Sequence, residues 1–553
     1  MMKRINVGYE DFKRLIERGC YYVDKSLFVR DIIQEDSTVM LFTRPRRFGK
    51  TLNMSMLYYF LSNTEKSKRL FTNLNIGKEE DGQYFKYLNK YPTIYITLKD
   101  LKNFRDYDMF LESLRLMLAG AFEKYRYLLN SDITDIQRQV IGDVLGNRAS
   151  EASLLISLKI LSDALYEQYK QRVYIIIDEY DASLTYAWLN GLYDEVLEFM
   201  KGFLGSALKS NMALEKGILT GVLRVSKENL FSDLNNIMVY DITKVKYSNY
   251  FGFNSEEVKE LLAYYGIEKK FNEVKRWYDG YLFGNTTIFN PWSILNYLQD
   301  EAHIFSPYWT NTGSNELLKK LIYNYHNDMI RGEFYELLET GILENVVIDY
   351  SINLDSVNVS RDAIWTLFMA SGYLKPSKQV QSNVGVTLEI PNREVKLSLE
   401  GIVVDWFRET YKRGDLLVNS LLNNDVNSFA KVLVSEIEDE VSYFDVPINT
   451  REIFYHGFIL GLLGRVRSYY EISSNRESGL GRYDVLLKPK KGTDSNLYIM
   501  EFKVIGDKES FGSSIRKAFR QIKEKRYDAP FREYKVVSMV IVFRGKEVLV
   551  EYK

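Results

Sequence analysis

The chain passes from the apolar stretch Thr38-Val-Met-Leu-Phe-Thr43 into Arg44-Pro-Arg-Arg-Phe-Gly49-Lys50-Thr51 and then into a helical pattern over 52–61. We expect a buried strand, a loop and a helix in this order. A Gly-Lys-Thr tripeptide at such a junction serves three chemical purposes. Gly49 lets the backbone approach a ligand, Lys50 supplies a point charge, and the Thr51 hydroxyl can ligate Mg²⁺. This layout is typical of a site for a nucleoside triphosphate.

The loop departs from the usual pattern G-x-x-x-x-G-K-[ST], because Arg44 stands where the first glycine is expected. One turn that faces the phosphates must therefore be built differently. An ordinary polar helix start is the alternative explanation of a lone Gly-Lys-Thr. The loop residues that we expect to bind the nucleotide are Arg44, Arg46, Arg47, Phe48, Gly49, Lys50 and Thr51.

A pair of acidic residues follows another apolar run. Val173-Tyr-Ile-Ile-Ile177 delivers Asp178 and Glu179 to its carboxyl end. Ligands of open α/β sheets bind at the carboxyl ends of the strands. We expect Asp178 to join Thr51 in binding Mg²⁺, and Glu179 to orient or deprotonate the attacking water. An acidic turn is the alternative, but the pair and the Gly-Lys-Thr loop together predict an NTPase.

A third polar strand end lies at Gly217-Ile-Leu-Thr220, which is followed by Gly221 and by Arg224. The Thr220 hydroxyl would sense the γ-phosphate, and Arg224 would stabilise charge in the transition state. A simple Thr-Gly turn is the alternative.

Apolar, β-branched runs alternate with helical segments in the first half of the chain, which predicts a mostly parallel α/β sheet of the P-loop kind, covered by helices. Helical stretches over 104–130 and 133–171 would be an insertion in this fold. The candidate strands are 38–43, 93–98, 173–177, 217–220 and 237–242, with 386–390 and 394–397 further on. We assign 1–245 to the nucleotide-binding domain, 246–300 to a helical lid, 301–420 to a connector or interaction region, and 421–553 to a C-terminal domain.

Length and composition exclude several classes. A chain of 553 residues is too long for a single core. Its net charge of −1 leaves any nucleic-acid binding to local basic clusters. Cys20 is the only cysteine and there are three histidines, so a metal site would use carboxylates, as Mg²⁺ sites do. No stretch reaches the roughly 18 apolar residues of a membrane span, and the start lacks a secretory signal, so we expect a cytoplasmic protein.

The C-terminal part carries a different set of charged residues. The stretches 483–488 and 496–504 are strand-like and are joined by a turn-rich loop. An antiparallel hairpin centred on that loop sets Asp484 opposite Glu501, and Lys503 shares the face of Glu501. Two carboxylates for Mg²⁺ and an ammonium group that positions or activates water are what phosphodiester hydrolysis requires. Routine residues of an amphipathic strand are the alternative.

Neighbouring residues could complete this second site. Gln521 lies in a basic helical stretch, from which it could reach the metal-bound water while its neighbours contact backbone phosphates. Glu452 and His456 lie one turn apart on an apolar helix, and Glu477 lies beside the hairpin. A solvated helix face is the alternative for the basic cluster, which comprises Arg516, Lys517, Arg520, Lys523, Lys525 and Arg526.

These motifs resemble those of bacterial AAA-ATPase-like proteins that carry a C-terminal PD-(D/E)XK nuclease-superfamily domain. The likeness spans nearly the whole chain, and Arg44 in the loop is usual for that family. It implies a restriction-endonuclease-like α/β fold for the C-terminal domain and a place near the adenine for 22–25. The matching segments are Tyr22-Val-Asp-Lys-Ser26, Arg44-Pro-Arg-Arg-Phe-Gly-Lys-Thr51, Ile177-Asp-Glu-Tyr-Asp181, Phe289-Asn-Pro-Trp292, Ser474-Asn-Arg-Glu-Ser-Gly479, Gly481-Arg-Tyr-Asp484 and Glu501-Phe-Lys503.

We therefore expect a protein that binds and hydrolyses ATP with Mg²⁺ and couples this to metal-dependent cleavage of DNA. The alternative is an ATP-dependent regulatory or signalling switch whose C-terminal domain only binds nucleic acid or a partner. A homo-oligomer is compatible with either. The predicted catalytic residues are Glu179, Asp484, Glu501, Lys503 and Gln521, and the predicted metal ligands are Thr51, Asp178, Asp484 and Glu501.

Overall fold

The computed structural model of the chain describes residues 2–209, 211–223, 236–309, 328–348, 360–378, 384–410, 414–441, 469–478, 481–493, 495–506, 509–544 and 547–553, with the single positions 321, 354, 380, 455, 459, 463 and 466. The chain divides into two compact units. The first consists of Met1–Leu317 and Glu344–Val395, and the second of Leu318–Leu343 and Lys396–Lys553.

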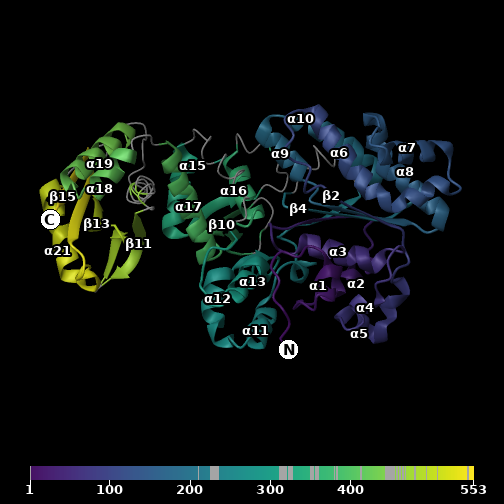
Figure 1. Ribbon diagram of the computed structural model, residues 1–553, viewed down its shortest axis with the longest axis horizontal. Coiled ribbons are helices and arrows are strands. Elements are labelled where there is room, and N and C mark those ends of the chain that lie inside the picture. The colour runs from purple at the N-terminus through teal and green to yellow at the C-terminus, as the bar shows by residue number, and fades with distance from the viewer. Residues whose placement is uncertain are drawn as a thin grey trace. The chain divides into compact units, whose positions relative to one another are not determined.

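The apolar runs predicted for the first half form one parallel five-stranded sheet in the first unit (Figure 1). The strand order is β2-β3-β4-β1-β5, so β4 lies between β1 and β3. The predicted parallel α/β fold is confirmed, and the carboxyl ends of β1, β4 and β3 are neighbours along one edge. The strands are β1 (Val39–Thr43), β2 (Thr93–Thr97), β3 (Val173–Asp178), β4 (Leu214–Gly221) and β5 (Ile237–Tyr240).

Helices cover both faces of this sheet, as parallel strands require. In Figure 1, α6 to α10 lie on one side of the sheet, and α3 lies on the other side with the small N-terminal helices. The predicted helical insertion is present between β2 and β3. It consists of α6 (Tyr107–Phe122), the 3₁₀ helix η2 (Glu123–Asn130), α7 (Asp135–Leu145) and α8 (Glu151–Tyr169). The other helices are α2 (Leu27–Gln34), α3 (Lys50–Leu61), α4 (Lys68–Phe71), α5 (Asn75–Lys78), η1 (Glu79–Tyr87), α9 (Ala182–Asn190) and α10 (Tyr193–Leu208).

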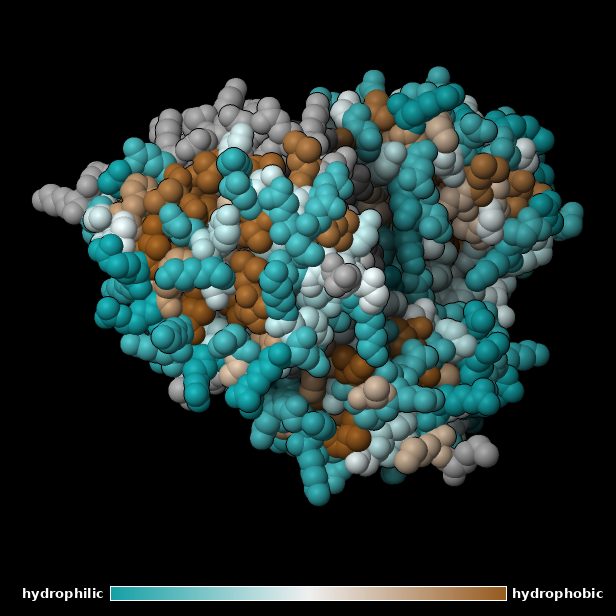
Figure 2. Space-filling model, turned by 60° about the vertical axis from the view of Figure 1, so that its left-hand side comes forward, coloured by the Kyte–Doolittle hydropathy of each residue, from teal (hydrophilic) through white to brown (hydrophobic). Residues whose placement is uncertain are grey.

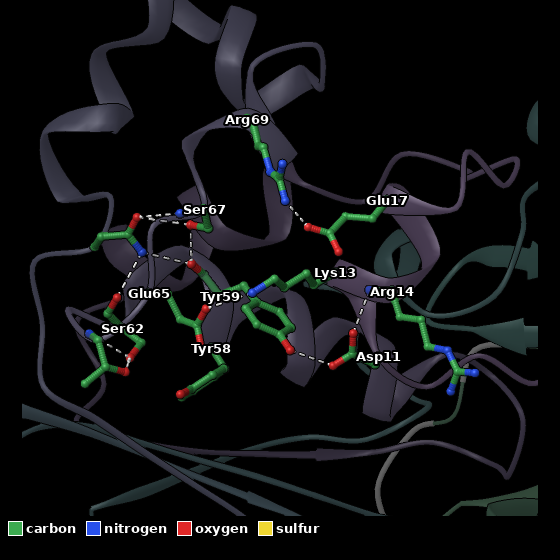
Figure 3. A network of polar contacts seen from close by, with 12 residues as sticks. Asp11, Lys13, Arg14, Glu17, Tyr58, Tyr59, Ser62, Glu65, Ser67 and Arg69 are labelled. Atoms are coloured by element: carbon green, nitrogen blue, oxygen red, sulfur yellow. Dashed lines mark hydrogen bonds and ion pairs between the residues drawn. The ribbon is translucent and has the colours of Figure 1, made fainter. Parts of the chain in front are cut away.

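The N-terminal helix α1 (Phe12–Glu17) is fastened to α3 and α4 by polar contacts (Figure 3). Asp11 caps α1 by accepting the backbone N–H of Arg14 at 2.7 Å, and its second oxygen accepts the hydroxyl of Tyr59 on α3 at 2.7 Å. Two ion pairs add to these contacts, Lys13–Glu65 and Arg69–Glu17. Each partly exposed pair contributes little by itself. Together they orient α1 and the residue before Asp11, Glu10, which faces the cavity described below.

The segment predicted as a helical lid contains helices and also a small hairpin that the sequence pattern did not predict. Strands β6 (Tyr281–Phe283) and β7 (Thr286–Ile288) pair antiparallel. Three residues are too few to establish an alternating pattern. The helical elements are η3 (Ser248–Tyr250), α11 (Ser255–Tyr264), η4 (Glu268–Lys270), α12 (Phe271–Tyr278) and α13 (Pro291–Gln299).

The candidate strand at 394–397 is wrong, because these residues begin the helix α17 (Arg393–Thr410). The side chain of Asn392 accepts the backbone N–H of Val395 at 3.0 Å, as an N-cap residue does. Val395, Leu399 and Ile402 are all buried, at the spacing of one helix face. The candidate strand at 386–390 is confirmed as β10 (Gly385–Glu389), which pairs between β8 (Ile342–Val347) and β9 (Lys375–Pro376). In the chain, helix α15 (Asp328–Thr340) precedes β8, and helix α16 (Arg361–Ala370) lies between β8 and β9.

The second unit contains a five-stranded sheet in the order β11-β12-β13-β14-β15. Strands β13 and β14 are parallel and are joined through α21 (Phe511–Lys525), while the other pairs are antiparallel. Ala518 and Ile522 of α21 pack on Leu497 and Ile499 of the sheet. The remaining elements are α18 (Gly414–Leu422), α19 (Val426–Val441), β11 (Tyr470–Ser478), β12 (Gly481–Pro489), β13 (Leu497–Val504), η9 (Ala529–Phe531), β14 (Val536–Arg544) and β15 (Glu547–Tyr552).

The surface is a mosaic of hydrophilic and hydrophobic residues on the face shown in Figure 2. In the described part of the chain, every helix is too short or too polar to span a membrane.

Candidate active sites

A cavity of about 420 Å³ lies where the loop after β1 faces the residue that follows β3. Lys50 and Thr51 line it from the loop and the start of α3, and Glu179 lines it from the end of β3. The two elements that carry the predicted nucleotide chemistry therefore face one space. The cavity is also lined by Asn6, Tyr9, Glu10, Tyr22, Lys25, Arg46, Arg47, Phe48, Gly49, Lys99, Tyr186, Phe253, Trp292 and Leu295.

Lys50 is buried, and its ammonium group lies across the loop. Its Nζ donates to the carbonyl oxygens of Arg44 at 2.9 Å and of Pro45 at 3.0 Å. Burial lowers the pKa of Lys50, while the nearby carboxylates of Glu179 and Asp178 act in the opposite direction. The loop thus holds a cation beside the cavity, at the helix start where anions bind.

Arg44 does not lie where the sequence predicted. Its guanidinium is fully buried between the rings of Phe251 and Phe283, at 5.0 and 5.1 Å, and does not line the cavity. Nη1 donates to the carbonyl oxygens of Thr43 at 2.8 Å and of Tyr240 at 2.7 Å, which joins β1 to β5. Arg44 therefore supports the sheet below the loop, and only its carbonyl oxygen reaches Lys50.

The unusual turn of the loop is made by Arg47. Its backbone is left-handed, with φ 69°, and Gly49 follows with φ 83°. A left-handed arginine is uncommon, because Cβ crowds the backbone there. The loop lacks the first glycine of the usual pattern. It makes a left-handed turn at Arg47 instead, two residues before Gly49, and not at Arg44.

The carboxyl ends of β3 and β4 are joined by a hydrogen bond from the hydroxyl of Thr220 to Asp178. Both residues are fully buried. Burial raises the pKa of Asp178, and hydrogen bonds from the hydroxyls of Thr220 and Thr51 act to lower it. A carboxylate and a hydroxyl in contact are ligands that Mg²⁺ accepts, so the donor set of Asp178 and Thr51 fits this ion. Glu179, next along the chain, has a left-handed backbone with φ 52°, and its side chain lines the cavity.

Sequence reasoning missed an acid that lies near Arg47, Glu10, and a cation that is paired with this acid, Lys99. The guanidinium of Arg47 lies 4.1 Å from the ring of Trp292, and Glu10 lies 3.9 Å from it. Glu10 also accepts Lys99 Nζ at 2.5 Å. Lys99 follows β2, so its place beyond a strand end was the signal that could have found it. Arg46 is exposed and lines the cavity, whereas Phe48 is buried against Tyr281 at 4.9 Å.

Of the segment 22–25, Tyr22, Val23 and Lys25 line the same cavity. Lys25 is buried and donates to both carboxylate oxygens of Glu257, at 2.6 and 2.7 Å, and to the carbonyl oxygen of Asn249 at 2.7 Å. Burial lowers the pKa of Lys25 and Glu257 opposes this. Tyr22, Tyr186 and Phe253 are among the aromatic residues that line this cavity.

Arg224 lies outside the described residues. The chain just before it is held by Asp181, whose carboxylate accepts the backbone N–H groups of Val222 at 2.9 Å and of Leu223 at 2.7 Å.

The hairpin of the second unit has the predicted register. Val485 pairs with Met500 and Leu486 with Ile499, which brings Asp484 beside Glu501. The backbone N–H of Phe502, the next residue, donates to Asp484 Oδ2 at 2.6 Å. Burial raises the pKa of Asp484, while this N–H and the charge of Lys503 act to lower it.

Glu501 is the centre of a buried polar cluster. Its Oε1 accepts Lys503 Nζ at 2.8 Å and Gln521 Nε2 at 2.5 Å. The fold thus gathers the predicted residues of β13 and of α21, 20 residues further on. Gln521 also donates to the hydroxyl of Tyr527 at 3.1 Å. Sequence reasoning missed Tyr527, whose only signal is its place just after the basic helix.

Other candidates around this cluster are less fully described. Glu452 and His456 lie outside the described residues, and Glu477 lies on β11 opposite Arg482, with its side chain outside the described part. The basic residues of α21 and its C-cap are exposed, namely Arg516, Lys517, Arg520, Lys523, Lys525 and Arg526.

The cluster around Glu501 therefore offers two carboxylates (Asp484 and Glu501), the amide of Gln521 and the ammonium group of Lys503. This donor set fits a divalent cation and a water molecule.

Comparison with known proteins finds a family match for each of the two regions that carry these candidate sites. The sequence model of a predicted AAA-ATPase family matches residues 6–231, and that of the PD-(D/E)XK nuclease superfamily matches residues 450–553. A protein of Azotobacter chroococcum mcd 1, described as an uncharacterized protein in the vnfD 5'region, is 24% identical over 552 residues, which cover 96% of this chain and 94% of that protein. The chain thus carries an AAA-ATPase-like domain followed by a domain of the PD-(D/E)XK nuclease superfamily.

Proposed function

We propose that the protein hydrolyses ATP in the cavity beside Lys50 and cleaves DNA at the Glu501 cluster. The observation that supports the first activity best is the contact between strand ends, in which Thr220 of β4 joins Asp178 of β3 beside the loop of β1. Glu179, the residue after Asp178, lines the same cavity as Lys50 and Thr51. A cation, a hydroxyl and an acidic group thus face one space beside this contact, as triphosphate chemistry requires.

Each residue of the first site has a role that follows from its position. Mg²⁺ held by Thr51 and Asp178 would neutralise charge on the phosphates. Lys50 supplies a fixed positive charge to the terminal phosphates. Thr220 orients the Asp178 carboxylate. Glu179 faces the cavity and accepts a proton from the attacking water.

The residues of the second site have different roles. A divalent cation at Asp484 and Glu501 would polarise a phosphodiester. Lys503 positions the water and offsets the negative charge that develops on the phosphate oxygens. Gln521 holds Glu501 and is carried by the basic helix α21, whose cations contact backbone phosphates without reading sequence.

The test is to incubate the purified chain with DNA, ATP and Mg²⁺ or Mn²⁺, and to follow phosphate release and strand cleavage in one sample. We expect both. Phosphate release without cleavage in either metal supports instead a regulatory switch whose C-terminal domain only binds nucleic acid or a partner. Cleavage without ATP turnover overturns the ATPase.

A further inference from the structure

The loop after β1, residues 44–49, is hydrogen-bonded to a buried tryptophan from a distant part of the chain. Nε1–H of Trp309 donates to the carbonyl oxygen of Arg46 at 3.3 Å. Trp309 is 1% exposed and packs on the ring of Tyr373 at 4.8 Å. Because C=O and N–H point in opposite directions in one peptide plane, this bond aims the N–H of Arg47 away from Trp309. Orientation of such N–H groups decides whether a loop can bind phosphate.

The same tryptophan is bound to the first turn of α17. Its backbone N–H donates to Glu394 Oε1 at 2.7 Å, and the hydroxyl of Ser293 donates to Glu394 Oε2 at 2.7 Å. Glu394 is fully buried. A buried carboxylate needs such donors, because its desolvation is otherwise costly. Glu394 is therefore held in one position, and it holds Trp309 in turn.

A second link runs in parallel through Trp292. Its ring lies 4.1 Å from the guanidinium of Arg47, and its Nε1–H donates to the carbonyl oxygen of Tyr308 at 3.2 Å. Tyr308 precedes Trp309, and Trp292 precedes Ser293. Arg46 is therefore hydrogen-bonded to Trp309, which binds Glu394. Arg47 contacts Trp292, whose neighbour Ser293 also binds Glu394.

Helix α17 then continues beyond the first unit. The first unit ends at Val395 and the second resumes at Lys396, within α17 (Arg393–Thr410). The start of this helix is fixed to the first unit by Asn392, whose Nδ2 donates to the carbonyl oxygen of Asp279 at 2.7 Å. The chain that carries the nuclease-like domain therefore leaves the first unit directly from the contact with Trp309.

We propose that Trp309 and Glu394 are positioning residues of the nucleotide site, which hold the loop for triphosphate binding and make the first turns of α17 respond to nucleotide. This inference rests on the proposed binding of ATP at the loop. The response follows because a loop that changes its hydrogen bonds on binding phosphate must also change the strain on Trp309 and Glu394.

Kinetics of ATP hydrolysis provide the first test. Trp309→Phe keeps a six-membered aromatic ring but loses the pyrrole part of the indole with its N–H, and we expect its KM for ATP to rise at least three- to tenfold, roughly as for one lost hydrogen bond, with kcat within about twofold. Trp277→Phe is the matched control, because the described contacts of that ring are with Tyr278, Phe305 and Arg393 at the same helix start. Glu394→Gln, which keeps an acceptor, should change KM less than Glu394→Ala.

Hydrogen exchange of the 393–402 amides in the full chain provides the second test and needs no activity. With ATP and Mg²⁺ we expect slower exchange in the wild type and in Trp277→Phe, and a smaller slowing in Trp309→Phe at saturating ATP, because the link through Trp292 remains. Equal changes in exchange rate in Trp309→Phe and Trp277→Phe would overturn this inference but not the proposed function. The same holds if the wild type binds ATP without any change in exchange at 393–402. A wild type that binds no more ATP than Lys50→Ala overturns the proposed function as well.

Discussion

Arg44 and Arg46 lie two residues apart, and their side chains meet opposite environments. The guanidinium of Arg44 is buried, and its burial lowers the pKa of Arg44 to about 10, which Asp241 opposes. Arg46 is exposed at the cavity. Arg44 therefore supports the sheet, whereas Arg46 lines the cavity in which we propose that ATP binds.

This difference predicts opposite outcomes for two substitutions. Arg44→Ala leaves the carbonyl oxygens of Thr43 and Tyr240 without their donor and opens a gap between Phe251 and Phe283, so we expect a loss of about 3 kcal/mol in the free energy of unfolding. Arg46→Ala should change that free energy by less than about 0.5 kcal/mol and weaken ATP binding. Urea unfolding and ATP titration measure both. Equal stability of the two variants would contradict the supporting role of Arg44.

Lys50 is the residue whose replacement should affect ATP turnover most. Lys50→Ala removes the point charge at the loop, and we expect kcat/KM to fall by about 100-fold or more, as for loss of a fixed transition-state charge. Lys259→Ala, on the exposed face of α11, is the control. Phosphate release measures the effect. Normal turnover by Lys50→Ala would show that the loop is not part of the ATP site.

At the scale of elements, α21 combines two faces. Ala518 and Ile522 pack on the sheet, while the basic residues face solvent. We expect Lys523→Ala with Lys525→Ala to weaken DNA binding equally for all sequences, and to reduce the slope of log Kd against log salt by about one per lost phosphate contact. Lys490→Ala with Lys491→Ala, in the exposed hairpin loop, is the control. DNA titrations at several salt concentrations measure this slope. An unchanged slope for the α21 variant would show that Lys523 and Lys525 do not contact phosphates.

The start of α17 should make stability depend on pH. Burial raises the pKa of Glu394 from 4.5 to about 7, against hydrogen bonds from Trp309 and Ser293. The folded state then binds the proton more tightly than the unfolded chain, so this contribution is complete below about pH 4.5 and is lost as pH rises through about 7. It amounts to about 3 kcal/mol. Glu394→Gln should flatten the curve, as urea unfolding between pH 4 and pH 8 would measure. Parallel curves for both proteins would contradict a raised pKa.

At the scale of the whole molecule, the two sites belong to different compact units. We expect Asp484→Ala and Lys503→Ala to abolish metal-dependent cleavage and to leave ATP turnover within about twofold, because neither residue lies in the first unit. Parallel assays of both activities measure this. Cleavage that persists in both variants would remove these residues from the site, and a parallel loss of ATP turnover would show that the units are catalytically coupled. The division of the chain at residues 245, 300 and 420 stays a prediction.

Much of the fold followed from local pattern. The five strands of the first sheet coincide with short apolar runs, and centring a hairpin on its turn-rich loop was enough to give the register in which Val485 pairs with Met500. The segment 394–397 misled because four residues alternate by chance, whereas its helical period appears only when Leu399 and Ile402 are included.

By itself, the sequence determined the five strands of the first sheet, the helical insertion and the C-terminal hairpin, and it placed Lys50 after the first strand, Asp178 at a strand end, and Glu501 and Lys503 on one strand. These follow from periodicity and short spacing, which act within a few residues. Only the tertiary structure decided that Arg44 turns into the sheet and that Trp309 holds the loop, because these bonds join residues 196 and 263 positions apart. Side-chain direction in a packed interior depends on partners that the chain brings together only on folding.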